Sequence, residues 1–197
     1  FDVRDSVLAG LDLSTGVPFL RDMIALYPAE VIFRHHMVDL LVEAGRPEEA
    51  RAECEAILRS AQDDVRSRYV LALLDELDGD PRAAVRRYEE IIAISGDLRA
   101  HELRVKLLWD TLRDFDAAAL ALADAWLAVR SAPAGEERDL RWANLENEER
   151  YMNEERATRD ALRDADSRLT RILAAIGAGW VLALGGGLAL LRRRGLV

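Results

Sequence analysis

The chain has 197 residues, of which 50% are apolar and 32% charged, and its formal net charge at pH 7 is −9. This acidic balance excludes the concentrated basic face that a nucleic-acid-binding protein needs. The single cysteine, Cys54, excludes an internal disulfide, so cysteine usage points to neither a reducing nor an oxidising compartment.

Apolar residues recur at spacings of three and four almost throughout, and glycine and proline are sparse, which predicts an all-α chain. A 34-residue period underlies this pattern. Five sets of positions carry the period, each with members 34 residues apart: Ala50, Ala84 and Ala118; Met37, Leu71 and Val105; Leu40, Leu74 and Leu108; Ile57, Ile91 and Ala125; Cys54, Tyr88 and Leu122.

Each period contains two apolar segments separated by a short break, which reads AGRPEEA, DGDPRAA or LRDFDAA. Gly45 and Gly79 suit the end of the first helix, because glycine adopts the left-handed cap conformation cheaply. Pro47 and Pro81 suit the first turn of the second helix, where the missing N–H is not needed. The breaks therefore predict three helix-turn-helix units over residues 31–132.

This pattern resembles the tetratricopeptide repeat family, whose 34-residue unit pairs two antiparallel helices. The matching residues are the small residue of the second helix (Ala50, Ala84 and Ala118), the turn glycines and the surrounding large apolar residues. Residues 16–30 look like the second helix of an earlier unit, so residues 1–30 are expected to form a partial N-terminal repeat. The chain departs from the family at its early aromatic position, which here holds Arg34, Arg68 and Glu102.

After a loop at residues 131–135, residues 136–171 are dense in charge and contain neither glycine nor proline. Opposite charges three or four residues apart, such as Asp160 and Arg163, predict a solvated helix. We expect this segment to cap the last repeat, as helical arrays require. We expect the helix to run unbroken into the bilayer.

Residues 172–191 read ILAAIGAGWVLALGGGLALL, and the basic tail 192–197 begins with three arginines. Twenty residues of helix are about 30 Å long, which matches the hydrocarbon layer, so we predict a single transmembrane helix. Ala175, Gly179, Ala183 and Gly187 form a stripe of small residues on it that would let another helix approach closely. The alternative is that this stripe follows from composition alone.

No pattern in the sequence indicates catalysis, a cofactor or a metal. His35 and His36 are adjacent and point to different faces, so they provide too few ligands for a metal site. Cys54 shares its repeat position with Tyr88 and Leu122, which indicates a buried, inert thiol. No phosphate-binding loop or nucleophile triad is present in the sequence. We therefore predict a protein that is not an enzyme.

The resemblance implies a partner-binding groove built from the first helix of each unit. Its predicted residues are His35, Asp39, Arg66, Tyr69, Leu73, Glu76, Leu103 and Leu107. Leucines with acids at the rim suit an apolar or amphipathic helical segment with basic edges. The clamp of basic residues and asparagine that holds a chaperone tail in the best-known family members is absent, since only Arg104 is of the right type. The alternative is that the protein's own segment 142–152 fills the groove.

These observations predict a single-pass membrane scaffold, an accessory or assembly subunit of a larger membrane complex, whose partners are proteins and the lipid bilayer. Two alternatives remain open. One is a tail-anchored adaptor that recruits a soluble protein, similar to the mitochondrial fission adaptor, and the other is the sensor portion of a signalling protein. The side of the membrane that holds the repeats is undecided, although a start at Phe1 without Met slightly favours processing.

Overall fold

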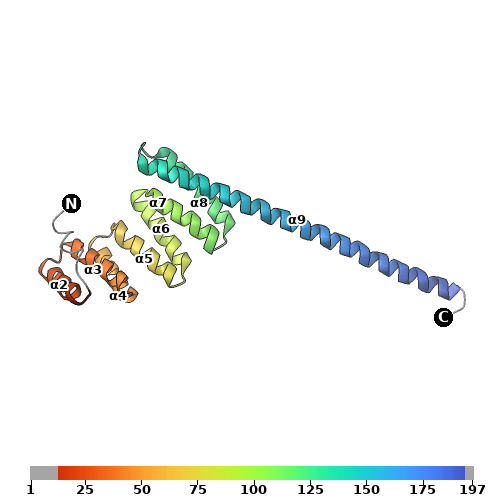
Figure 1. Ribbon diagram of the computed structural model, residues 1–197, viewed down its shortest axis with the longest axis horizontal. Helices are drawn as coiled ribbons and strands as arrows, with labels where there is room; N and C mark the ends of the chain where they lie inside the picture. Colours follow the sequence, from red (N-terminus) through yellow and green to blue (C-terminus); the bar gives the residue numbers. More distant parts are fainter. Residues whose placement is uncertain (1–12, 194–197) are drawn as a thin grey trace. The chain divides into compact units, whose positions relative to one another are not determined.

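The computed structural model describes the backbone of residues 13–193 and the side chains of residues 14–174 (Figure 1). Over this part of the chain the structure consists of helices and contains no strand, so the prediction of an all-α fold is confirmed. The chain divides into two compact units, Phe1–Asn147 and Glu148–Val197.

The helices follow one another with short connections. In chain order they are α2 (Leu13–Leu26), α3 (Val31–Glu43), α4 (Pro47–Ser60), α5 (Val65–Leu77), α6 (Pro81–Ser95), α7 (Leu98–Lys106), the π-helical turn η1 (Leu107–Thr111), α8 (Phe115–Ser131) and α9 (Glu136–Arg193).

In the first unit, helices α2 to α8 stack in chain order, and each packs against the next (Figure 1). The pairs α3 with α4, α5 with α6, and α7 plus η1 with α8 are the three helix-turn-helix repeats. Contacts between α4 and α5 and between α6 and α7 join one repeat to the next. This arrangement confirms a fold built from helical repeats, in which each unit buries its apolar face against its neighbour.

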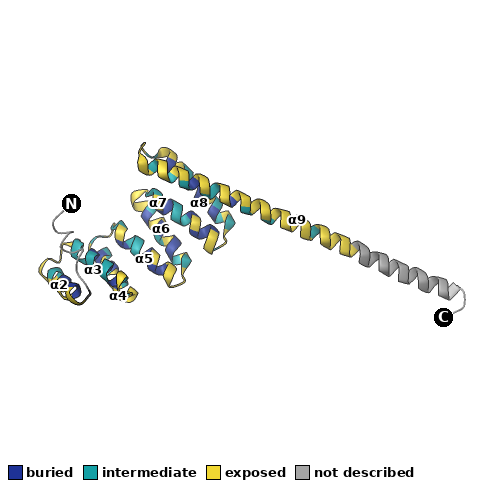
Figure 2. Ribbon diagram, viewed as in Figure 1, coloured by how far each residue is buried: buried dark blue, intermediate teal, exposed yellow. Residues whose placement is uncertain are grey.

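Residues that recur every 34 positions in the sequence form the buried core. Figure 2 shows the buried residues gathered where neighbouring helices face one another. Ala50, Ala84 and Ala118 each have 0% of their surface exposed. Among the five periodic sets, every residue is buried except Leu40, which is half-buried. The small alanines allow close approach of the helices, and the larger residues fill the space around them.

The turn inside each repeat requires a left-handed residue at one fixed position. Gly45 and Gly79 adopt φ of 67° and 78°, and Arg113, one period later, adopts φ of 54°. A non-glycine residue in this region is strained by contact between Cβ and the backbone. In the third repeat this residue follows the π-helical turn η1 and places its guanidinium Cζ 5.1 Å from the centroid of the Phe115 ring.

Helix α9 is one continuous helix from Glu136 to Arg193. Over the residues that the structure describes, no helix combines the length and the apolar character needed to cross a membrane. Most of the predicted span 172–191 lies beyond residue 174, and the small residues Ala175, Gly179, Ala183 and Gly187 lie outside the described side chains. The transmembrane helix therefore stays a prediction from the sequence.

Replacing Arg113 with glycine is expected to stabilise the first unit by about 0.5–1 kcal/mol, because glycine relieves the left-handed strain while the contact with Phe115 is lost. Urea unfolding followed by circular dichroism measures the change. The matched control is Gly79→Ala, which should destabilise by about 1 kcal/mol. A Cβ at Gly79 meets no atom within 4 Å, so that control isolates the backbone cost. A loss of stability in Arg113→Gly would contradict the interpretation that the left-handed backbone of Arg113 is strained.

Candidate functional site

The candidate site is the face formed by the first helices of the three repeats, α3, α5 and α7 with η1. The eight residues predicted for the groove lie on these helices. Their side chains differ in role: some join one repeat to the next, some are buried, and one region stays accessible. The accessible region is the part that can receive a partner.

Two predicted groove residues, His35 and Tyr69, hold neighbouring repeats together. His35 Nε2 lies 3.1 Å from Asp64 Oδ2, and the Tyr69 hydroxyl donates to Asp97 Oδ1 at 2.8 Å. Asp64 and Asp97 are the N-cap residues of α5 and α7, the first helices of the next repeats. His35 and Tyr69 are one period apart, so the same connection occurs twice. Leu103, the next residue in this series, has no polar group.

Asp39, Arg66 and Glu76 lie nearer to solvent. Arg66 Nη2 donates to Asp39 Oδ2 at 2.5 Å, which joins α5 to α3, and both side chains remain more than 40% exposed. Glu76 Oε1 accepts a hydrogen bond of 2.7 Å from the Tyr88 hydroxyl. Because the Asp39–Arg66 pair is solvated, it contributes little stability, about 0–1 kcal/mol, and its charges remain available to a ligand.

The accessible apolar part of the site is on α5. Leu73 and Leu77 are 47% and 72% exposed, whereas Leu107 is buried and Leu103 is half-buried. Two leucines exposed four residues apart form a continuous patch on one face of the helix. Exposed acids lie at the C-terminal ends of the first helices: Glu43 of α3, Glu76 of α5 and Asp110 of η1. Within the described residues neither Glu43 nor Asp110 makes an ion pair, so the rim carries uncompensated negative charge.

The beginning of α9 docks at the end of the array rather than over this patch. Glu102 Oε2 accepts from Arg141 Nη1 at 3.0 Å, and Asn144 Nδ2 donates to the same carboxylate at 3.1 Å. The Trp142 and Trp126 rings meet edge to face, with centroids 4.9 Å apart. Residues 136–147 therefore cap the third repeat and leave Leu73 and Leu77 exposed. In this part of α9, the alternative of a self-filled groove is not observed.

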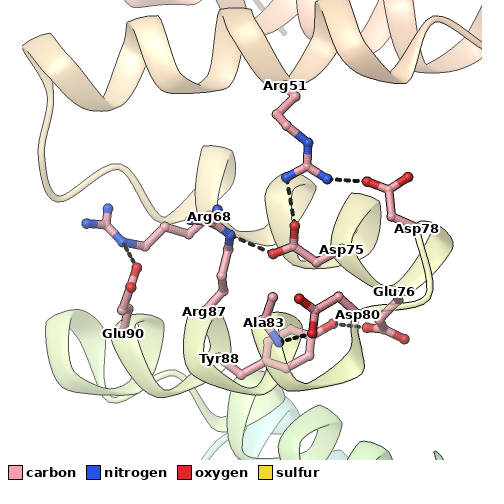
Figure 3. A network of polar contacts seen from close by, with 10 residues as sticks. All are labelled: Arg51, Arg68, Asp75, Glu76, Asp78, Asp80, Ala83, Arg87, Tyr88 and Glu90. Carbon is pink, nitrogen blue, oxygen red and sulfur yellow. Dashed lines mark hydrogen bonds and ion pairs between the residues drawn. The ribbon is translucent and has the colours of Figure 1, made fainter.

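A buried carboxylate fixes α5 between its neighbours (Figure 3). Asp75 Oδ1 accepts from Arg51 Nη1 of α4 at 2.7 Å, and Asp75 Oδ2 accepts from Arg87 Nε of α6 at 2.9 Å. Arg51 also donates to Asp78 at 2.6 Å, and its bond to Asp75 is the main cause that raises the pKa of Arg51. This network orients the helix that carries Leu73 and Leu77.

Two buried titratable groups, Cys54 and His101, have shifted pKa values. Burial raises the pKa of the Cys54 thiol to about 12, which keeps it protonated and unreactive at neutral pH. Burial, followed by the charge of Arg104, lowers the pKa of His101. Arg104 itself pairs with Asp124 at 3.0 Å. No group of three or more metal-binding side chains occurs among the residues described.

Sequence reasoning missed the aspartates that begin the helices. Asp64, Asp80, Asp97 and Asp114 each accept a backbone N–H through the side chain, for example from Ser67 at 2.7 Å and from Ala83 at 2.9 Å. An aspartate before an apolar periodic segment is an N-cap pattern that could have found them. The second role of Asp64 and Asp97, contacting His35 and Tyr69, follows only from the three-dimensional packing.

Comparison with known proteins agrees with the repeat architecture. A family model described as tetratricopeptide repeat matches residues 12–74. Among solved structures, the MamA RS-1 ArsTM double mutant is similar to this chain, with a TM-score of 0.51, 17% sequence identity and coverage of 60% of this chain and 67% of that chain. At this identity the likeness shows the fold alone. None of the curated proteins searched matches the chain.

Removing the buried charge at Asp75 is expected to destabilise the first unit. Asp75→Asn keeps the shape of the side chain but removes the charge that strengthens its hydrogen bonds with Arg51 and Arg87. We therefore expect a loss of about 2–4 kcal/mol in the free energy of unfolding. Asp78→Asn is the matched control: its side chain is 49% exposed, so the loss should stay within about 0.5 kcal/mol. Urea unfolding of both variants measures the difference, and equal losses would contradict the role of Asp75.

Proposed function

We propose that this chain is a membrane-anchored scaffold that does not catalyse a reaction and acts by binding a protein partner on the first helices of its repeats. Helical repeats of this type generally serve as scaffolds for protein–protein interaction. The partner we infer belongs to a larger membrane complex, in which the chain is an accessory or assembly subunit. The adaptor alternative shares the same binding face and differs in recruiting a soluble protein.

The observation that carries the proposal is the exposure of Leu73 and Leu77 beside uncompensated acids. Burying two leucines against a partner would contribute about 1.5–3 kcal/mol each before the costs of association. Glu43, Glu76 and Asp110 favour basic groups, and the negative end of each helix dipole adds to this preference. The complementary ligand is an amphipathic helix whose apolar stripe is flanked by lysine or arginine.

Membrane anchoring is proposed from the sequence of residues 172–191 and the arginines that follow. An apolar stretch of this length suits one crossing, and a basic cluster at its end suits retention at the membrane surface. The small residues Gly179 and Gly187 would place a partner helix close to this span. The anchor would hold the repeats at the membrane on which their partner resides.

Charging the exposed leucines should abolish partner binding. The double variant Leu73→Lys/Leu77→Lys, purified from its native membrane in mild detergent, is expected to retain less than about a tenth of the stoichiometric membrane subunits that accompany the unmodified chain. Leu26→Lys, on an equally exposed leucine of α2, should leave them unchanged. Co-purification of soluble partners alone would overturn the complex-subunit proposal in favour of the adaptor.

Membrane attachment should depend on the apolar stretch. After a wash with alkaline carbonate, the full chain is expected to remain in the membrane pellet, whereas a chain ending at Arg171 should move to the supernatant. The control is Gly179→Leu/Gly187→Leu, which keeps the stretch apolar and should stay in the pellet while losing partner subunits. Release of the full chain by carbonate would contradict an integral span.

A further inference from the structure

Helix α8 carries an exposed stripe on the side opposite to its buried face. The stripe consists of Asp116, Leu120, Ala123, Leu127 and Arg130, and all five residues are exposed. At 100° per residue these positions fall within an arc of about 80°. Leu120 and Leu127 are 71% and 68% exposed. No described residue of the first unit covers this stripe.

The stripe is not required by the repeat fold. The equivalent exposed positions in the first two repeats hold mostly charged residues: Arg86, Glu89 and Ala93 on α6, and Ala52, Glu55 and Arg59 on α4. Only the third repeat has leucine, alanine and leucine there. Because solvated faces of an array are normally polar, the change to apolar residues in one repeat indicates a surface that is covered in the assembled protein.

The order of residues in the stripe makes it complementary to itself. Asp116 lies seven residues before Ala123, and Arg130 lies seven residues after it. When two α8 helices cross in opposite directions about a two-fold axis at Ala123, Leu120 of one copy meets Leu127 of the other. Asp116 then meets Arg130 of the second copy at both ends. Within the described residues neither Asp116 nor Arg130 makes an ion pair inside its own chain.

We propose that this stripe is the contact of a symmetric homodimer, in which two copies of the chain pack α8 against α8. A two-fold contact uses the same patch twice, so it demands the self-complementarity seen here. Ala123 at the centre lets the helix axes approach, and the leucines on either side exclude water. The contact involves one helix from each copy and is smaller than a standard protein interface, so the dimer is concentration-dependent. This surface is separate from the partner-binding patch on α5.

Charge reversal tests the pairing. Sedimentation of the full chain in mild detergent is expected to give twice the mass of one chain, falling to a single chain on dilution. Asp116→Arg places two arginines together at both ends and should weaken the dimer about tenfold or more, as should Arg130→Asp. The double variant D116R/R130D restores opposite charges and should regain the dimer. The matched control is Arg82→Asp, one period before Asp116 on α6, which should leave the mass unchanged.

Cross-linking tests the geometry. Ala123→Cys brings two Cβ atoms together at the two-fold axis, so mild oxidation should give a disulfide-linked dimer. Ala93→Cys on α6 should give none, and buried Cys54 does not interfere.

A single-chain mass at all concentrations would overturn the proposal, as would a dimer that D116R does not weaken. If the two charges serve only the dipole of their own helix, D116R/R130D will lose stability without regaining the dimer. A dimer that is lost in Leu162→Lys/Leu169→Lys of α9 and kept in D116R would place the contact on α9, which also overturns it.

Discussion

The first unit depends on the close approach of helices at three alanines one period apart. Ala50 of α4 belongs to one buried cluster with Val17 of α2, Met37 of α3 and Leu74 of α5. A larger residue there would separate its repeat from both neighbours. Because each repeat completes its core with residues from the next, stability is held mainly in the interfaces between repeats. The same packing fixes the face that carries Leu73 and Leu77.

The helical-repeat architecture could be predicted from the sequence because it follows the 34-residue period. Residues 34 apart share one environment, so the helix pairs, the breaks at Gly45 and Gly79 and the core positions follow from repetition. What the sequence did not reveal depends on contacts between side chains of different repeats. His35 and Tyr69 were expected to line a groove, and they also bind the N-cap aspartates of the following helices. Such a contact depends on reach and rotamer, which periodicity does not encode.

The candidate site shows the same division. Leu73 and Glu76 were predicted at the groove and are exposed, while Leu107 was predicted there and is buried. Positions one period apart therefore differ in exposure even though their helices correspond. The π-helical turn η1 begins at Leu107, so the third repeat presents a different face at this point. Arg113 stands one period after Gly79 and keeps its left-handed conformation. Only the structure reveals this backbone geometry.

Two exposed apolar patches lie on different helices of the first unit. Leu73 and Leu77, among acids, face outward from α5, and Leu120 and Leu127, between an acid and an arginine, face outward from α8. The first patch has one sign of charge and suits a foreign ligand of opposite sign. The second has both signs in mirrored order and suits a copy of itself. Asp75 joins α5 to Arg51 of α4 and Arg87 of α6, and it is itself buried.

The last junction of the array uses a different repeat position from the two junctions before it. His35 contacts Asp64, and the Tyr69 hydroxyl donates to Asp97. Glu102 instead accepts hydrogen bonds from Arg141 and Asn144 of α9. Arg34 and Arg68 precede Glu102 at the same repeat position and bind Glu53 and Glu90 of their own repeats. The reversal of charge at Glu102 lets this position accept hydrogen bonds from Arg141 and Asn144 of α9. The end of the array therefore differs from the two inner junctions, where the same contact with an N-cap aspartate occurs twice.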